Sequence, residues 1–309
     1  PEVPEVYVAL GDLYRGTDRS DFAVDLLEGF EAERGPGHPE IQRSLADAYK
    51  KLGRYEESRQ AYLRSIESDP DTARTHARLG HLMYVQGQLE AALAHWQDAL
   101  ELEPHNPRHH TNTGGILYYL GRFEEAVEAY ELSTTFAPTG RAYSNAGTSY
   151  YYMGDYDRAL TNFAQGVELM PEDYRIRGNL GDACRMVPIC APDAPDHYGQ
   201  ALTMVDEHLK VQPQDSTAAA MKALYLGHLG RIPECRASLN RALSGEELDS
   251  EVYWSAAVIF ALLKEQDRAR EFVERAKASG YPAAVLAADP DLRPLYLAQA
   301  GNPTEGAPP

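Results

Sequence analysis

Cysteine is scarce in this chain, and its few residues form no recognisable pattern. Only three of the 309 residues are cysteines, Cys184, Cys190 and Cys235, and none of them belongs to a CxxC pair. Secreted proteins that depend on disulfides carry a denser and even-numbered set of cysteines. We therefore expect no disulfide framework.

Positive charge is also in short supply. The chain has 29 Lys and Arg residues against 47 Asp and Glu residues, which gives a net charge of −18 and an isoelectric point near 4.9. Because nucleic acids and anionic membranes are bound through a basic face, this balance excludes them as the main ligand. The net charge is nevertheless compatible with a local strip of basic residues.

The sequence lacks long apolar runs and catalytic motifs as well. No segment approaches the length of a membrane-spanning helix, and we expect neither a signal peptide nor direct membrane insertion. There is no GxSxG, phosphate-binding loop, HExxH or dinucleotide fingerprint, so we expect no enzyme activity and no cofactor. The ten histidines include His105, His109 and His110, but their spacing does not converge on a metal, so we assign them structural roles.

The first residue is Pro1 rather than Met. We therefore expect the chain to be part of a longer protein, with further domains upstream. The expected location is the cytoplasm, or the periplasm if a membrane anchor precedes Pro1.

What the chain does contain is a regular repeat of about 34 residues. Its glycines are Gly53, Gly87, Gly121 and Gly154, and its prolines are Pro70, Pro104, Pro138 and Pro171, both at steps of 34, 34 and 33 residues. Each glycine can end the first of two amphipathic helices. Each proline closes a unit because it cannot continue a helix. The period predicts stacked helix pairs.

Residues of fixed size occupy fixed positions within this period. The small pairs that let two helices approach are Leu79-Gly80, Thr113-Gly114, Ala146-Gly147 and Leu180-Gly181. The small residues at the helix crossing are Ala92, Ala126 and Ala159, and the large residues four positions later are Trp96, Tyr130 and Phe163. The pattern resembles the tetratricopeptide repeat family. The resemblance implies an all-α, right-handed superhelix (an α-α solenoid) of about eight helix-turn-helix repeats, with a concave groove and a short C-terminal cap.

The same pattern divides the chain. The expected repeat units are a degenerate first unit at 1–38, the well-matched units at 39–172, a sixth unit at 173–213 and two C-terminal units at 214–281. Residues 282–300 would form a cap over the last open helix pair. Residues 301–309 form a Gly/Pro-rich tail that we expect to be disordered. The sixth unit carries a Pro-rich insertion at 186–196, where three prolines exclude a continuous helix, and we expect its second helix to resume near Tyr198.

The three cysteines can now be placed on the repeats. Cys184 and Cys235 fall at core positions, where we expect them to be buried and inert. Cys190 lies in the insertion, where we expect it to be exposed.

Four of the first helices carry two polar residues four positions apart. Because positions i and i+4 share a helix face, each pair forms a polar rung, and stacked repeats would align the rungs into a ladder. These rungs are Arg74 with Arg78, Arg108 with Asn112, Arg141 with Asn145, and Arg175 with Asn179. The equivalent first positions in the other units are Glu5, Glu40, Thr217 and Glu251.

Tyrosines follow three of these rungs. Tyr84, Tyr118 and Tyr151 each lie ten residues after the first arginine, and Tyr119 and Tyr152 stand beside the last two. Amphipathic aromatic residues favour binding surfaces. We expect one tyrosine of each pair to face the groove and the other to face the core.

Two interpretations of the rungs remain open. In the first, the carboxamides hold a peptide backbone and the arginines bind carboxylates. This is similar to the asparagine ladder of O-GlcNAc transferase and importin-type solenoids, and in part to the carboxylate clamp of chaperone-binding family members, whose Lys–Asn pair has no counterpart here. In the second, the arginines pair with acids of neighbouring helices, Arg74 with Asp69 or Asp71 and Arg108 with Glu101 or Glu103.

The expected function is a non-catalytic protein–protein interaction module. Its groove would bind an extended peptide or protein tail that carries acidic groups or a C-terminal carboxylate. The end of the chain, with Gly280-Tyr281-Pro282 and the segment 289–295, also resembles the C-terminal tetratricopeptide regions of large bacterial signalling proteins that carry a Ser/Thr kinase, winged-helix regulator, cyclase or TolB-like domain. That resemblance implies the alternative, a sensor or assembly arm that self-associates as a homodimer.

Overall fold

The computed structural model describes residues 3–246 and 248–300, with side chains as far as Tyr296. All regular secondary structure in this part of the chain is helical, and the predicted all-α fold is confirmed. The tail at 301–309, which we expected to be disordered, lies outside the described residues.

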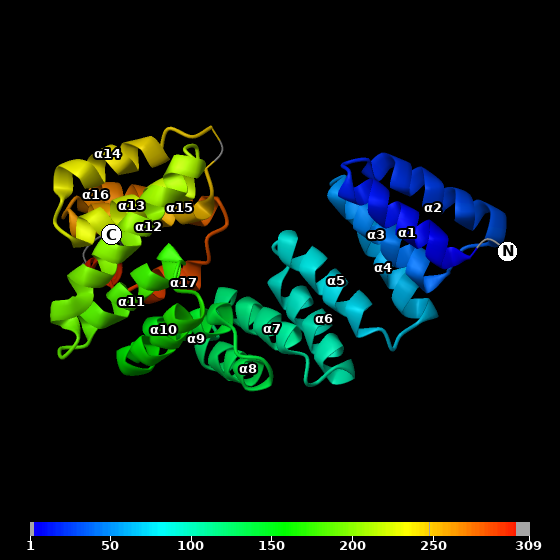
Figure 1. The fold of residues 1–309 in the computed structure, drawn as a ribbon, viewed down its shortest axis with the longest axis horizontal. Coiled ribbons are helices and arrows are strands. Elements are labelled where there is room, and N and C mark those ends of the chain that lie inside the picture. Colours follow the sequence, from blue (N-terminus) through cyan, green and yellow to red (C-terminus); the bar gives the residue numbers. More distant parts are fainter. Residues whose placement is uncertain (1–2, 247, 301–309) are drawn as a thin grey trace, which may run out of the picture. The chain divides into compact units, whose positions relative to one another are not determined.

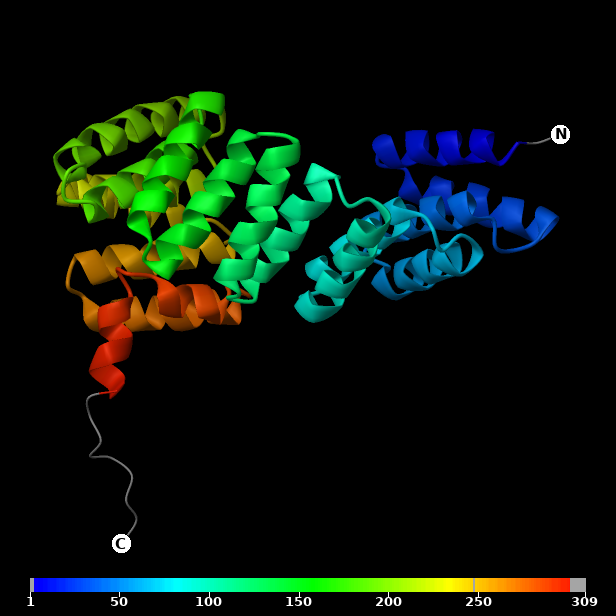
Figure 2. The same ribbon diagram turned by 90° about the horizontal axis from the view of Figure 1, so that it is seen from below.

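Consecutive helices form pairs that are joined by short turns, as Figures 1 and 2 show. The pairs are α1 (Pro4–Gly16) and α2 (Ser20–Arg34), α3 (Pro39–Lys51) and α4 (Tyr55–Ser68), α5 (Ala73–Val85) and α6 (Leu89–Leu102), α7 (Pro107–Tyr119) and α8 (Phe123–Phe136), α9 (Gly140–Met153) and α10 (Tyr156–Leu169), α11 (Tyr174–Met186) and α12 (Ala194–Val211), α13 (Ser216–His228) and α14 (Ile232–Ala242), and α15 (Ser250–Leu262) and α16 (Gln266–Ala278). Two short helices follow, α17 (Ala283–Ala288) and α18 (Arg293–Ala300). The predicted solenoid of about eight helix-turn-helix repeats is confirmed.

The chain divides into two compact units, residues 1–116 and 117–309, with the boundary inside α7. The first unit holds α1 to α6 and most of α7. The second unit holds the last residues of α7 and all later helices.

Small residues at the helix crossings let the two helices of a pair pack closely. Ala92, Ala126 and Ala159 are fully buried, and the large aromatic residue four positions after each of them is buried too. A side chain at Gly147 would meet the ring of Phe163, because a Cβ built there lies 2.8 Å from Phe163 Cδ1. The repeat pattern is therefore a requirement of packing.

The glycines of the repeat end the first helices in a left-handed conformation, as predicted. Gly87 and Gly121 have φ angles of 72° and 77°, which residues with a side chain rarely adopt. Gly121 is also crowded, because a Cβ built there lies 2.5 Å from Ala284 Cβ. Gly87 has no such neighbour.

The insertion in the sixth unit differs from expectation in two ways. The second helix does not resume near Tyr198 but begins at Ala194, after a short 3₁₀ turn at Ala191–Asp193. Pro195 lies in the first turn of α12, where the N–H that proline lacks has no helical partner to lose. The segment between α11 and α12 is therefore shorter than 186–196: it spans residues 187–193 and contains two of the three prolines.

The second difference concerns the cysteines. Cys184 is buried as expected, but it forms a disulfide with Cys190, so the expectation of an inert thiol there was wrong. The two cysteines are six positions apart in sequence, and the turn after α11 brings their Cα atoms to 4.9 Å. Cys235 is free and buried, as expected.

The C-terminal segment packs against more than the last helix pair. Leu286, Leu292 and Leu295 share an apolar cluster with Phe260 and other residues of α15 and α16. Val285, in contrast, is buried in a second cluster with aromatic residues of the earlier helices α8, α9 and α10. The segment therefore does more than cover the last helix pair, because it also contacts α9.

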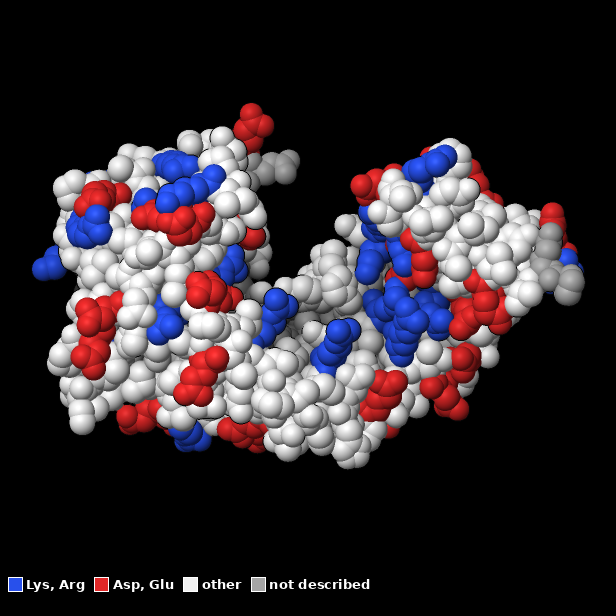
Figure 3. All heavy atoms as spheres, viewed as in Figure 1, with Lys and Arg blue, Asp and Glu red and all other residues white. Residues whose placement is uncertain are grey.

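No helix in the described part of the chain is both long and apolar enough to cross a membrane. The face shown in Figure 3 carries interspersed acidic and basic side chains in both units.

Candidate functional site

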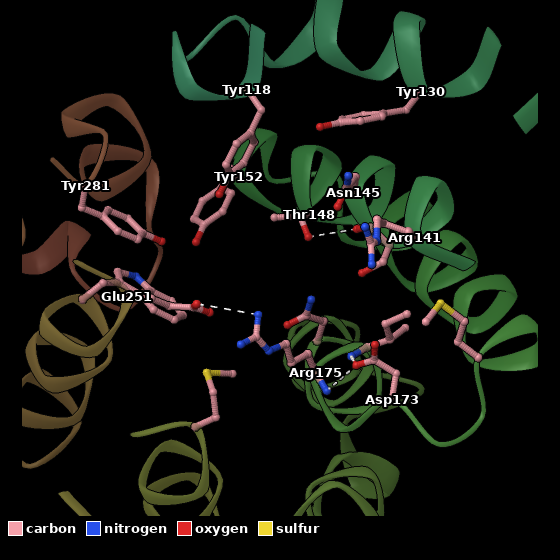
Figure 4. Close-up of a pocket in the computed structure, with 16 residues that line it drawn as sticks. Tyr118, Tyr130, Arg141, Asn145, Thr148, Tyr152, Asp173, Arg175, Glu251 and Tyr281 are labelled. Atoms are coloured by element: carbon pink, nitrogen blue, oxygen red, sulfur yellow. Dashed lines mark hydrogen bonds and ion pairs between the residues drawn. The ribbon is translucent and has the colours of Figure 1, made fainter. Parts of the chain in front are cut away.

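The second unit contains a pocket of about 400 Å³ whose walls come mainly from first helices of the repeats. Helices α9, α11, α13 and α15 all contribute side chains to it. Tyr118 at the end of α7, Tyr130 of α8 and Tyr281 before α17 complete the wall, and Figure 4 shows these side chains around the cavity.

Both rungs of the second unit line this pocket. Arg141 and Asn145 project from α9, and Arg175 and Asn179 project from α11. Each helix begins at a capping residue, which fixes the arginine in its first turn. Thr139 accepts a hydrogen bond from the Ala142 amide, and Asp173 accepts hydrogen bonds from the amides of Arg175 and Ile176.

The two arginines of the pocket differ in their electrostatic partners. Arg175 Nη1 lies 3.8 Å from Glu251 Oε2, an acid that α15 places across the cavity (Figure 4). Burial raises the pKa of Glu251, and the positive charge of Arg175 counteracts only part of that effect. Arg141, in contrast, forms no ion pair with any acid among the described residues. One guanidinium of the pocket is therefore available to an anion.

The two carboxamides are also available. Within the described part of the chain, the side chains of Asn145 and Asn179 form no hydrogen bond, although both are half-buried. A carboxamide can donate two hydrogen bonds and accept two. Together with Arg141, these groups offer unused hydrogen-bonding capacity within one pocket.

Aromatic side chains line the opposite side of the pocket. The rings of Tyr118 and Tyr152 lie 5.9 Å apart, and the rings of Trp254 and Tyr281 are stacked, also at 5.9 Å. Burial raises the pKa of Tyr118, Tyr152 and Tyr281 well above the ordinary value, so all three act as neutral phenols. This part of the pocket suits an apolar or aromatic group.

The predicted tyrosines are not all in the pocket. Tyr118 lines it, but Tyr151 does not, and the neighbouring Tyr152 takes that place. The hydroxyl of Tyr151 accepts a hydrogen bond from Arg185 Nη2 at 2.8 Å. We therefore replace Tyr151 by Tyr152 in the candidate set.

The remaining predicted residues belong to the first unit. Arg74, Arg108 and Asn112 are exposed there, and the proposed pairs of Arg74 and Arg108 with neighbouring acids are not formed among the described residues. Tyr84 is half-buried, with its ring 6.4 Å from that of His81.

Arg78 is engaged in a buried charge cluster of the first unit. Its guanidinium pairs with the carboxylate of Asp47, which also lies 2.8 Å from Arg15 Nη1 and accepts a hydrogen bond from the Tyr62 hydroxyl at 2.5 Å. We remove Arg78 from the candidate set, because its charge is already compensated.

The pocket residues that sequence reasoning missed include Glu251, Trp254 and Tyr281. The repeat register gave a signal for Glu251, which occupies the first rung position of its unit. No signal in the sequence placed Trp254 or Tyr281 there, because their position depends on the path of the C-terminal segment.

Comparisons with known proteins agree with this architecture. Models of the tetratricopeptide repeat match residues 46–87, 78–141 and 140–173. No curated protein sequence matches the chain. Residues 46–173 therefore match tetratricopeptide repeats, and the helix pairs in the described part of the chain form a solenoid of that type, a class of helical scaffolds for protein–protein interaction.

Three solved structures illustrate the likeness of fold. A tetratricopeptide repeat protein from Parabacteroides merdae matches with a TM-score of 0.59 and 18% identity, over 84% of this chain and 98% of that chain. The C-terminal part of a repeat protein from Cytophaga hutchinsonii matches with a TM-score of 0.58 and 18% identity, over 77% and 95%. The APC/C hetero-tetramer Cut9-Hcn1 matches with a TM-score of 0.59 and 17% identity, over 89% of this chain and 49% of that chain. At these identities the likeness concerns the fold alone.

Proposed function

We propose that the second unit binds a short peptide segment that carries an acidic group, in the pocket lined by Arg141, Asn145 and Asn179. The observation that carries the proposal is the unused hydrogen-bonding capacity of these three side chains in one half-buried cavity. Hydrogen bonds to a charged group are stronger than those between neutral groups, so a carboxylate that reaches Arg141 contributes most to affinity.

Each part of the pocket suits a different part of such a ligand. The guanidinium of Arg141 can bind a carboxylate through two parallel hydrogen bonds. The carboxamides of Asn145 and Asn179 can pair with backbone N–H and C=O groups, whatever the peptide sequence. Trp254 and Tyr281 can contact an apolar or aromatic side chain.

The volume of the cavity also limits the length of the ligand. A volume of about 400 Å³ lies in the lower part of the range that is typical of ligand pockets. It accommodates a few residues rather than a long extended tail. The proposal therefore concerns a short acidic segment or a C-terminal carboxylate.

A peptide library tests the proposal. Short acidic peptides with internal or C-terminal carboxylates are screened against the full chain, and the affinity of the tightest one is measured by fluorescence anisotropy. The double variant Asn145→Ala/Asn179→Ala is expected to bind this peptide about 10- to 100-fold more weakly, which corresponds to about 1.4–2.8 kcal/mol. Circular dichroism should show an unchanged helical content.

The first unit offers a matched control. Asn112 occupies the same repeat position as Asn145 and Asn179, but it lies in the first unit and is exposed. Asn112→Ala should leave the affinity unchanged. Equal binding of the peptide by the double variant and by the natural protein contradicts the proposal.

A second candidate function rests on the C-terminal segment. Tyr281 stacks on Trp254, Asp291 pairs with Arg185, and Val285 is buried against α8 and α9, so the C-terminal segment packs on earlier helices of the second unit. We infer that such an array can serve as the assembly arm of a larger bacterial signalling protein, self-associating through other surfaces. Light scattering over a range of concentrations tests this function, because a monomer at every concentration would contradict it.

A further inference from the structure

Two of the three cysteines lie close to a histidine in the sixth repeat. The sulfur atoms of Cys184 and Cys190 and a ring nitrogen of His197 all lie within 4.8 Å of one another. In the structure the two cysteines form a disulfide. The three residues come from the end of α11, the insertion and the first turn of α12.

The repeat fold does not require this cluster. In the second to fifth repeats, two or three residues join the two helices of a pair, whereas residues 187–193 separate α11 from α12. These extra residues contribute Cys190 and turn the chain so that His197 approaches both sulfur atoms. The insertion therefore adds a chemical feature that the other helix connections lack.

The imidazole of His197 has no partner that explains its position. Its Nδ1 atom is shielded from solvent and forms no hydrogen bond with the described residues. A buried polar atom without a partner costs free energy, typically about 1–3 kcal/mol. A ligand that accepted the lone pair of the imidazole would remove this cost.

The only other metal-like cluster among the described residues differs in this respect. His76, His95 and Asp98 also gather within 4.8 Å. There, however, Nδ1 of His76 and Nδ1 of His95 both contact the Asp98 carboxylate, and Nε2 of His76 lies 3.2 Å from the Pro70 carbonyl oxygen. These contacts account for that cluster without a metal.

Reduction of the disulfide would give the first cluster a complete set of nitrogen and sulfur ligands. A dithiol reductant transfers two electrons and two protons to the disulfide, which gives two cysteine thiols and leaves the reductant as a disulfide. Two thiolates and an imidazole are ligands that Zn²⁺ prefers. Zn–S bonds of about 2.3 Å at tetrahedral angles place two sulfur atoms about 3.8 Å apart. Two thiols that no longer share a bond separate to a similar distance.

We propose that Cys184, Cys190 and His197 form a redox-controlled zinc site, in which the dithiol form binds Zn²⁺ and the disulfide form does not. Binding of the cation displaces the two thiol protons into solvent. Asp193 and Asp196 are exposed beside His197, and either carboxylate, or a water molecule, can supply a fourth ligand. Thiol–disulfide exchange with an external disulfide, which is reduced to two thiols, would oxidise the two cysteines, release the metal and join the end of α11 to the insertion.

Cobalt titration of the full chain tests this proposal. The protein is reduced with a dithiol, freed of reductant under nitrogen and titrated with Co²⁺, which reports thiolate ligands by sulfur-to-metal charge-transfer absorption. One equivalent of Co²⁺ should bind with this absorption, and Zn²⁺ should displace it. The air-oxidised protein should show no such absorption, and alkylation with mass spectrometry should find Cys184 and Cys190 protected.

Variants distinguish the three ligands. His197→Gln should weaken Co²⁺ binding at least about tenfold, and Cys190→Ser, a change at a partly exposed position, should abolish the absorption. Cys235→Ala is the control: burial raises the pKa of the Cys235 thiol to about 11, and that residue lies outside the cluster. Its Co²⁺ binding should equal that of the natural protein.

Three results would overturn the proposal. The first is equal Co²⁺ binding by the reduced and oxidised proteins. The second is unchanged binding by His197→Gln, which would leave the histidine without a role. The third is complete alkylation of Cys184 and Cys190 after exposure to air, which would exclude the disulfide state. Circular dichroism of each variant identifies any loss of fold, and Cys190→Ser provides a second test if His197→Gln is unstable.

Discussion

The same repeat positions have different surroundings in the two units of this protein. In the first unit, Arg74, Arg108 and Asn112 are exposed, and Arg78 compensates the buried carboxylate of Asp47. In the second unit, all four rung residues line one pocket, closed on one side by Trp254 and Tyr281. A shared register therefore does not define a shared site. The surrounding elements decide whether a polar pair stabilises the fold or remains available to a ligand.

The acids that pair with rung arginines provide the sharpest test of this difference. Asp47 of the first unit is buried and contacts Arg15, Arg78 and Tyr62. Asp47→Ala leaves Arg78 without an ion-pair partner among the described residues, whereas Arg15 keeps its contact with Asp12 at 2.8 Å. The expected cost is about 3–5 kcal/mol of unfolding free energy. Urea unfolding measures this cost in Trp254→Phe, where Trp96 is the remaining tryptophan and reports on the first unit.

The matched change in the second unit is Glu251→Ala. Because the Arg175 side chain is about half exposed and its contact with Glu251 is 3.8 Å long, water can replace the lost partner. We expect Glu251→Ala to lower the unfolding free energy by less than about 1 kcal/mol. Urea unfolding measures this change through Trp254 fluorescence in the Trp96→Phe protein, in which Trp254 is the remaining tryptophan. Similar costs for the two substitutions would show that the rungs of both units are structural.

The glycines at the helix ends separate the units in a second way. Gly87 and Gly121 share a repeat position and a positive φ angle, but only Gly121 contacts the C-terminal segment, through Ala284. Gly87→Ala should cost about 1–2 kcal/mol from backbone strain. Gly121→Ala should cost about 1–3 kcal/mol more, because the added methyl group displaces α17.

Thermal unfolding of the two glycine variants measures this difference. Gly154→Ala is an internal control within the second unit, because its φ angle is also positive and its surroundings are open. If Gly121→Ala and Gly154→Ala had equal costs, the contact with Ala284 would be unimportant for stability.

The stability of the second unit should change with pH because of Asp289. Burial, with a further contribution from Asp291, raises the pKa of Asp289 from 3.8 to about 7. The folded state binds this proton more tightly than the unfolded state. The resulting contribution to the unfolding free energy is therefore fully present below about pH 4 and is lost as the pH rises to about 7. The loss should be about 2–4 kcal/mol.

Asp289→Asn should remove this part of the pH dependence. A carboxamide oxygen can still accept the hydrogen bond that Trp254 Nε1 donates at 2.9 Å. The measurement is urea unfolding of the Trp96→Phe protein, with and without Asp289→Asn, at pH values from about 4 to 8. An identical pH dependence in both proteins would show that Asp289 is ionised throughout.

The smallest expected effect on stability is that of Arg141→Ala. Arg141 is exposed and has no acid partner among the described residues, so its removal should change the unfolding free energy by less than about 0.5 kcal/mol. Its effect on the affinity for an acidic peptide should be at least tenfold, about 1.4 kcal/mol. Arg108→Ala, at the same position in the first unit, should change neither quantity. A loss of affinity in Arg108→Ala as large as that in Arg141→Ala would place the binding surface in both units.

By itself, the sequence determined the repeat architecture of this protein. The spacing of Gly53, Gly87 and Gly121, with alanine at each helix crossing and an aromatic residue four positions later, fixed the helix pairs and the ends of the first helices. Such features depend on neighbours within about 34 residues, so a local pattern is sufficient to predict them. The same register identified Arg141, Asn145, Arg175 and Asn179, which the pocket contains.

Only the tertiary structure decided which of these residues share a site. Arg78 and Arg141 are equally polar in sequence, but Asp47 forms an ion pair with the first and no described acid forms one with the second. Glu251, Trp254 and Tyr281 reach the pocket because α15 and the C-terminal segment return to helices more than 70 residues earlier. The pairing of Cys184 with Cys190 depended on the turn after α11. The contacts of Trp254 and Tyr281 leave no periodic signal, because they join segments through the folded core rather than through the repeat.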